Sequence, residues 1–190
     1  MKVVKLEKSK VIIGIMMALM FFIPTGQKVN AYDRSYTALD LYVALEENEA
    51  VPYTLTDKAI DFISEHDDLF PSSDDLDLPE ELIDSELDSK HVNKSPSKYG
   101  DRMMVLPLTQ VVQIEEEEIE EGSYFTFLNL IDWTGQQYSV FYYGELEDIF
   151  EDDSVLVTGL PLGTSSFENG LGGQIPVIVI AGSIVWNMVE

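Results

Sequence analysis

Apolar and polar residues alternate along the second half of the chain with the two-residue period of β-strands. From residue 103 onward this pattern predicts five strands, at residues 103–114, 124–131, 137–143, 155–160 and 175–186. The first strand is expected to break or bulge at Pro107, because proline cannot donate to a strand ladder. Asp132-Trp133-Thr134-Gly135 is expected to form the hairpin turn after the second strand. A glycine-rich loop is expected at residues 163–173.

The connector between the third and fourth strands, residues 144–153, is acidic and is expected to hold one helical turn at residues 145–149. Five strands with a helical connector only at that point follow the strand plan of an OB barrel. The last strand is apolar on both faces, so one face needs the barrel interior and the other a cover. The predicted fold class is therefore mainly β, a five-stranded OB-like barrel at residues 103–190 with a short α-helical N-terminal segment.

The helical segment is expected at residues 32–70. Apolar residues recur at helical spacing from Asp57 to about His66, after Thr56 as a plausible N-cap, and this helix is the expected cover of the last strand. Residues 38–45 fit one or two further helical turns. Residues 71–102 are rich in Ser, Asp and Pro and are predicted to be an acidic linker. Its cations are expected to lie against acids of the barrel: Lys90, Lys94, Lys98 and Arg102.

Residues 1–31 have the pattern of an export signal. Four lysines precede an apolar run of thirteen residues, 11–23, and Val29-Asn30-Ala31 is the small-x-small pattern that signal peptidase cuts. Thirteen residues are fewer than the ~20 that cross a bilayer comfortably. Cleavage after Ala31 is expected; the alternative is an uncleaved anchor at residues 11–23, the only expected contact with the membrane. Either way the expected location is secreted or on the extracellular face of the membrane.

The charge of the chain excludes most anionic partners. The formal net charge is -24, and removal of residues 1–31, which hold five lysines and Glu7, changes it by -4 to -28. Residues 103–190 contain fifteen acids and neither lysine nor arginine. Such a chain repels nucleic acids and anionic lipids. It contains no cysteine, so disulfides do not stabilise it.

Four stretches resemble a pattern of uncharacterised exported or membrane-tethered proteins of Gram-positive bacteria: VVQIEE, LIDWTGQQYSVFYYG, DDSVLVTGLPLG and SFENGLGGQIPVIVIAGSIV. In that group an OB-like domain, similar to the anticodon-binding type, follows a helical segment. The resemblance covers residues 95–186, and its motifs are structural. It implies this fold and an exported location, and it assigns no activity to particular residues.

OB barrels bind oligonucleotides on the face of their second and third strands and through two loops. Aromatic residues are available there for stacking, but the predicted loop at residues 115–121 holds six glutamates. Single-stranded nucleic acid is therefore a disfavoured alternative. Ca²⁺ held by the acidic clusters is a second alternative, although their spacing matches no EF-hand and successive strand residues point to opposite faces.

Catalytic patterns are not found. The two histidines, His66 and His91, have no zinc-ligand spacing, and Ser165 and Ser166 have neither a GxSxG elbow nor a histidine in the same domain. We expect no enzymatic activity, no cofactor and no metal site. The preferred hypothesis is a module that binds a protein or peptide at the cell surface. The candidate binding face comprises Tyr138, Tyr142, Tyr143, Phe167 and Asn169.

Overall fold

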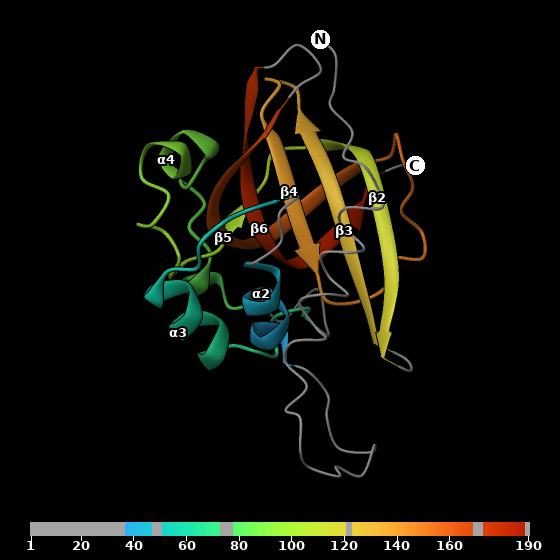
Figure 1. The fold of residues 1–190 in the computed structure, drawn as a ribbon. Helices are drawn as coiled ribbons and strands as arrows, with labels where there is room; N and C mark the ends of the chain where they lie inside the picture. Colours follow the sequence, from blue (N-terminus) through green and yellow to red (C-terminus); the bar gives the residue numbers. More distant parts are fainter. Residues whose placement is uncertain (1–36, 47–50, 73–77, 121–122, 169–172, 189–190) are drawn as a thin grey trace.

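The computed structural model describes residues 37–46, 51–72, 78–120, 123–168 and 173–188 (Figure 1). The predicted export signal, residues 1–31, lies outside these ranges. Within them, no helix is both long and apolar enough to span a membrane.

Six strands form the sheet of the second half of the chain (Figure 1). They are β1 (Met104–Val105), β2 (Thr109–Glu120), β3 (Ser123–Asp132), β4 (Gln137–Tyr142), β5 (Ser154–Glu168) and β6 (Gln174–Asn187). Strands β2, β3 and β4 are antiparallel neighbours, β4 pairs in parallel with β6, and β6 pairs antiparallel with β5. Strand β5 returns to β2 through Val155 and Ser154, which closes the ring. This closed order, with its one parallel pair, confirms the predicted OB-like barrel.

The positions of the five predicted strands are confirmed, but two of them run further than predicted. The first is interrupted at residues 106–108, which separates β1 from β2, as expected around Pro107. Strand β2 then continues through the glutamates, which pair with β3 as far as Glu120, so the predicted acidic loop is wrong. Strand β5 continues to Glu168 and pairs with the start of β6, so most of the predicted glycine-rich loop is strand. Residues 145–149 form a turn rather than a helix.

The barrel strands bury side chains on both of their faces. On β6, Ile178 and Ile180 lie in the cluster that fills the barrel, whereas Val177 and Val179 lie in a second cluster on its outer face. The two-residue alternation of strands explains the division. A barrel interior and a separate cover were both predicted for this strand, and both are present.

Two helices build the cover on the outer face, α2 (Ala38–Glu46) and α3 (Asp57–Glu65) (Figure 1). Thr56 is the N-cap of α3, as predicted, and its side-chain oxygen accepts a hydrogen bond from the Ala59 amide at 3.2 Å. The two helices are joined at their ends, because the Ala38 amide donates to Asp67 Oδ1 at 3.0 Å. Leu41 and Leu45 of α2 are fully buried beside the apolar face of α3.

Residues 78–102, which lie in the predicted linker, are packed on the barrel. They contain the 3₁₀ helix η1 (Glu80–Leu82) and the helix α4 (Ser89–Lys94). Leu87 and Val92 are buried in the interior cluster, so this segment closes one end of the barrel. In residues 78–102 the apolar residues are separated by charged ones without a clear helical or strand periodicity, so the sequence pattern did not predict this packing. The division of the chain into a segment, a linker and a barrel stays a prediction.

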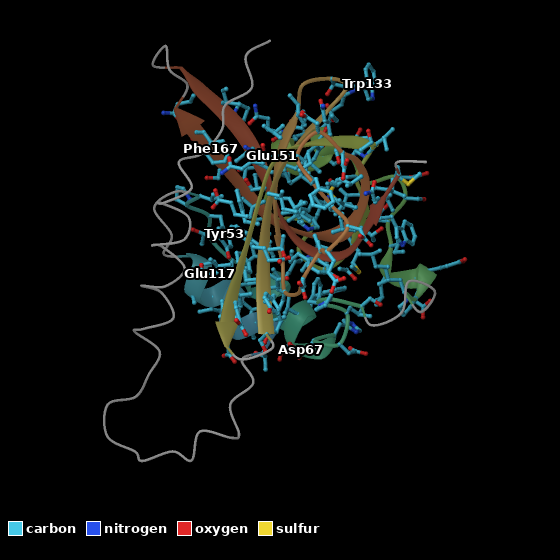
Figure 2. The ribbon with its side chains drawn as sticks, turned by 90° about the vertical axis from the view of Figure 1, so that its right-hand side faces the viewer. Tyr53, Asp67, Glu117, Trp133, Glu151 and Phe167 are labelled. Carbon is cyan, nitrogen blue, oxygen red and sulfur yellow. The ribbon has the colours of Figure 1, made fainter. Side chains whose placement is uncertain are left out.

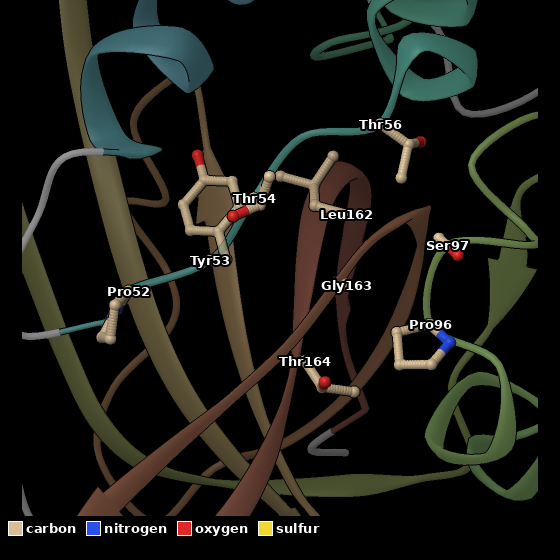
Figure 3. Close-up of a pocket in the computed structure, with 9 residues that line it drawn as sticks. All are labelled: Pro52, Tyr53, Thr54, Thr56, Pro96, Ser97, Leu162, Gly163 and Thr164. Carbon is tan, nitrogen blue, oxygen red and sulfur yellow. The ribbon is translucent and has the colours of Figure 1, made fainter.

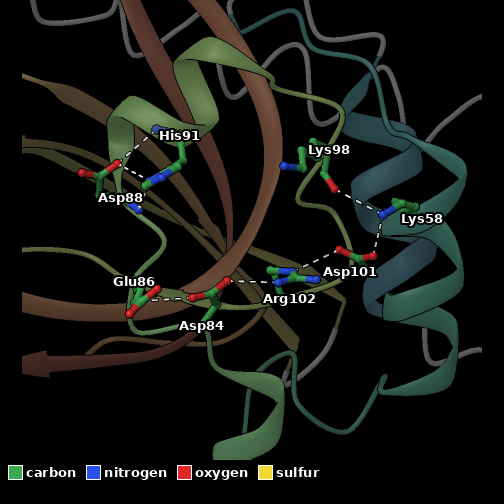
Figure 4. A network of polar contacts seen from close by, with 8 residues as sticks. All are labelled: Lys58, Asp84, Glu86, Asp88, His91, Lys98, Asp101 and Arg102. Carbon is green, nitrogen blue, oxygen red and sulfur yellow. Dashed lines mark hydrogen bonds and ion pairs between the residues drawn. The ribbon is translucent and has the colours of Figure 1, made fainter.

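A chain of ion pairs connects this segment to α3 (Figure 4). Lys58 of α3 pairs with Asp101 at 2.5 Å, and Arg102 contacts Asp101 at 3.4 Å and Asp84 at 3.1 Å. These contacts hold the pKa of both carboxyls below the usual value, chiefly through hydrogen bonds from Lys58 and Arg102. The expectation that Arg102 lies against barrel acids is wrong, because its partners are in its own segment. Lys98 lies over the ring of Tyr99.

Candidate functional site

The outer face of β3 and β4 is where OB barrels bind their ligands, and in this chain it is aromatic. Phe125 and Phe127 of β3 and Phe141 of β4 are at most 1% exposed. The rings of both β3 residues lie 5.8 Å from the Phe141 ring. Three adjacent rings of this kind provide a stacking surface of the type that nucleic-acid bases use.

The chain covers this surface with its own N-terminal segment. The Tyr53 ring packs 5.6 Å from the Phe141 ring, and the Tyr42 hydroxyl donates to the Phe141 carbonyl oxygen at 3.3 Å. The Tyr53 hydroxyl in turn donates to the Tyr42 carbonyl oxygen at 2.5 Å. Burial raises the pKa of both tyrosines. The stacking surface is therefore occupied by α2 and the irregular residues 51–55.

The four described residues of the predicted binding face are not assembled on one surface. Tyr138 is fully buried in the barrel interior, where its hydroxyl donates to Asp132 Oδ2 at 3.1 Å. Phe167 lies in β5 and is 4% exposed, packed in the outer cluster. Tyr142 and Tyr143 are partly buried on opposite faces of the sheet, and Asn169 lies outside the described residues. The aromatic residues of β4 do not form an exposed row, because both faces of this strand are packed against apolar clusters.

The glutamates of β2 alternate between the two faces of the sheet. Glu115 and Glu117 pair with Phe127 and Phe125 and share their outer face. Each has one buried carboxylate oxygen, Oε2, without a hydrogen-bond partner among the described residues. Burial, together with Glu115, raises the pKa of Glu117. Glu116 Oε2 instead accepts from Thr126 Oγ1 at 3.2 Å and from the Leu146 amide at 2.9 Å.

This alternation separates the carboxylates rather than gathering them. In the described part of the chain, no three histidine or acidic side chains are arranged to hold a metal ion. The acidic run is accordingly one paired strand whose charges are distributed over both sides of the sheet.

A shallow cavity of about 420 Å³ lies beside the cover (Figure 3). Tyr53 and Thr54 line one side, Leu162 and Gly163 of β5 form the second, and Pro96 forms the third. Its lining carries no ionisable acid, base or thiol except the buried phenol of Tyr53. The pocket therefore offers neither a nucleophile with a general base nor a set of metal ligands.

Exposed large apolar side chains gather at the opposite part of the barrel, around the ends of β2, β5 and β6. They are Val105, Leu108, Trp133, Phe150, Trp186 and Met188. Figure 2 shows Trp133 extending away from the barrel, and 87% of its surface is exposed. Sequence reasoning identified this residue only as part of a hairpin turn. A tryptophan in a predicted turn was the available signal, because a large apolar side chain in an exposed turn indicates an interaction surface.

The hairpin that presents Trp133 is rigidly built. Asp132 Oδ1 accepts hydrogen bonds from the Thr134 amide at 2.8 Å and the Gln136 amide at 3.0 Å, and Gly135 has a φ of 90°, which favours glycine. The predicted turn at residues 132–135 is confirmed. The hydrogen bonds within this turn fix the backbone position of Trp133 beyond the ends of β3 and β4.

Comparison with known proteins adds little. No model of a protein family matches the chain, and no curated protein does. Among solved structures, the second OB-fold domain of replication protein A from Methanococcus maripaludis matches 47% of this chain and 84% of its own, at 18% identity and a TM-score of 0.26. The fold assignment is therefore argued from the strand order and pairing.

Proposed function

We propose that the protein is an exported, non-enzymatic OB-like module that binds a protein or peptide at the cell surface. The observation that carries this proposal is the cover on β3 and β4. Tyr42 and Tyr53 occupy the aromatic face that an OB barrel offers to nucleic acid. A ligand of this protein has to bind elsewhere, on a surface without the cations that phosphates require.

The charge distribution supports the same proposal. Residues 103–190 contain neither lysine nor arginine, and the whole chain has a formal charge of -24. The lysines and arginines of the described residues are Lys58 in α3 and, in the segment 84–102, Lys90, Lys94, Lys98 and Arg102. Figure 4 shows Lys58, Lys98 and Arg102 among their polar contacts. Nucleic acid and anionic lipid are repelled by such a barrel, whereas basic or neutral protein surfaces are not.

Two measurements test the proposal. The exported protein is used as bait for surface proteins of its own cells, with an acidic protein of similar size and charge as control; specific retention of one protein is expected. A labelled single-stranded oligonucleotide is then titrated at low salt, where phosphate contacts are strongest. No shift is expected. Tight, salt-sensitive binding of the oligonucleotide, or no retained protein, would overturn the proposal.

A further inference from the structure

Four residues form an outward strip across the end of the barrel, in the order Trp133, Leu108, Leu156 and Trp186. Thr109 is the last residue of its ladder and pairs with both Asp132 and Val155. Continuing that register by one residue places Leu108 between Trp133 of the turn and Leu156 of β5. Leu156 pairs directly with Trp186. Neighbouring strands are ~4.8 Å apart, so the strip spans roughly 15 Å.

Two more apolar residues, Phe150 and Met188, are held beside this strip by hydrogen bonds of their backbone amides. Asp153 Oδ2 accepts hydrogen bonds from the Phe150 amide at 2.8 Å and from Asn187 Nδ2 at 3.3 Å, which holds Phe150 beside the end of β6. The Met188 amide donates to the Ser154 carbonyl oxygen at 2.8 Å. We call the outward strip together with Phe150 and Met188 the apolar end patch.

The apolar end patch is unusual in its composition as well as in its exposure. Trp133 and Phe150 are 87% and 63% exposed, and Trp186 is 37% exposed. The chain contains two tryptophans, and both are in this patch. Scattered apolar side chains are normal on a surface, but a contiguous group with aromatic anchors marks an interaction site.

The charges around the patch decide what kind of partner fits it. The connector between β4 and β5 contains Phe150, and on either side of it exposes four acidic residues: Glu147, Asp148, Glu151 and Asp152. The barrel sequence supplies no lysine or arginine to neutralise them. A second copy of this chain, with its charge of -24, meets like-charge repulsion here, and so does an anionic lipid surface. A partner with lysine or arginine side chains gains Coulomb attraction from the carboxylates and cation–π contacts from the two indole rings.

We propose that the apolar end patch binds a lysine- or arginine-rich amphipathic segment of another protein. The apolar side chains of that segment lie on Leu108, Leu156 and Trp186, and its cations meet the connector carboxylates and Trp133. This inference rests on the proposed function and adds to it the place and the chemistry of the partner.

The two tryptophans make the binding directly measurable. Tryptophan fluorescence is followed while the full chain is titrated with a synthetic amphipathic peptide of lysine and leucine. Two peptides serve as controls, one with glutamate in place of lysine and one with serine in place of leucine. Because both indoles are in the patch, a saturable spectral change is expected with the lysine–leucine peptide, and its affinity should fall as salt rises. Equal responses to the peptide with glutamate would overturn the proposal.

Variants then locate the site, with affinity measured through a label on the peptide. Trp133→Ala and Trp186→Ala are each expected to weaken binding about tenfold, the loss typical of an aromatic anchor. The matched control is Tyr124→Ala, an aromatic residue beside the glutamates of β2, which should bind as the wild type does. Thermal melting confirms that each variant is folded; Trp133 is mostly exposed, so its replacement leaves the core intact. Unchanged affinity in both tryptophan variants would overturn the proposal.

Other occupants give different results. A dimer in sedimentation that Trp186→Ala dissociates, or an indole spectral change with vesicles of phosphatidylcholine and phosphatidylglycerol, would also overturn this inference. If the surface protein retained by the bait is bound equally well by Trp133→Ala and Trp186→Ala, the inference fails while the proposed function stands. If no surface protein is retained at all, the proposed function itself fails.

Discussion

Replacement of Leu45 by alanine tests whether α2 is an integral part of the barrel. Leu45 is fully buried in the outer cluster, between α2 and the aromatic face of β3 and β4. Leucine-to-alanine changes at such sites cost about 2–5 kcal/mol, because both the buried methyl groups and their packing contacts are lost. In a domain of 150–250 residues, 1 kcal/mol lowers the melting temperature by about 2–4 °C. The expected drop is therefore roughly 4–20 °C.

The assay uses the tryptophans as reporters of the barrel. Trp133 is already mostly exposed, so the fluorescence change comes mainly from the partly buried Trp186. Trp186 lies on the apolar end patch and not in the cover, so its signal follows unfolding of the barrel rather than of α2. If α2 and the barrel unfold together, the Leu45→Ala variant loses its tryptophan signal at a lower urea concentration and a lower temperature. The control is Asp61→Ala in α3, an exposed position where a change within about 0.5 kcal/mol is expected. An unchanged tryptophan-detected midpoint in Leu45→Ala would refute the reasoning, because it would mean that α2 detaches without affecting the barrel.

Three further outcomes are expected. Burial raises the pKa of Tyr42 and Tyr53, so above pH ~10 the unfolded chain loses phenol protons that the folded chain keeps. The free energy of unfolding should therefore fall with rising pH by about 1.4 kcal/mol per pH unit for each tyrosine. Urea midpoints that stay constant from pH 9 to pH 11 would contradict this. Glu117→Gln should stabilise the protein at pH 7 by roughly 0.5 kcal/mol after solvent screening, since burial and a neighbouring carboxylate raise the pKa of Glu117 and disfavour its charged form. The stability of the wild type should approach that of the variant as falling pH protonates Glu117, and equal melting temperatures of the two proteins at pH 7 would contradict this prediction. Gly159→Ala should destabilise by about 1–3 kcal/mol, because a methyl group there overlaps a carbonyl oxygen of β6, and calorimetry that finds no loss would exclude this close approach.

The sequence predicted the barrel because its strands have a strong pattern. The last strand is apolar on both faces, a composition that requires cover on both sides, and the structure supplies it through the interior cluster and α2 with α3. The helix after Thr56 was equally clear, since a capping residue precedes an apolar set at helical spacing. Both features are determined by residues close together in the sequence, so the local pattern of apolar and polar residues is enough to predict them.

The ends of the strands depended on pairing partners and were not predictable in the same way. Residues 115–120 have no apolar alternation, yet they form strand because β3 supplies a ladder for them. Gly163 was interpreted as the start of a loop, but it lies at a register shift within β5 where its φ is 149°. The candidate binding face was predicted from exposed aromatic residues, but Tyr138 points into the barrel interior and Phe167 packs in the outer cluster beneath the N-terminal cover.

The hydrogen bond from Tyr42 to Phe141 joins residues that are 99 positions apart. Ribosomes complete α2 long before β4 and β6 exist, so the helix has no docking surface until almost the entire polypeptide has emerged. During that interval the phenylalanines of β3 and β4 and the apolar side of α2 are both uncovered, and long-range contacts of this kind form slowly. Docking of α2 is therefore expected to be a late step of folding, although α2 is synthesised before the barrel. A chaperone that shields the aromatic strands would act before this docking.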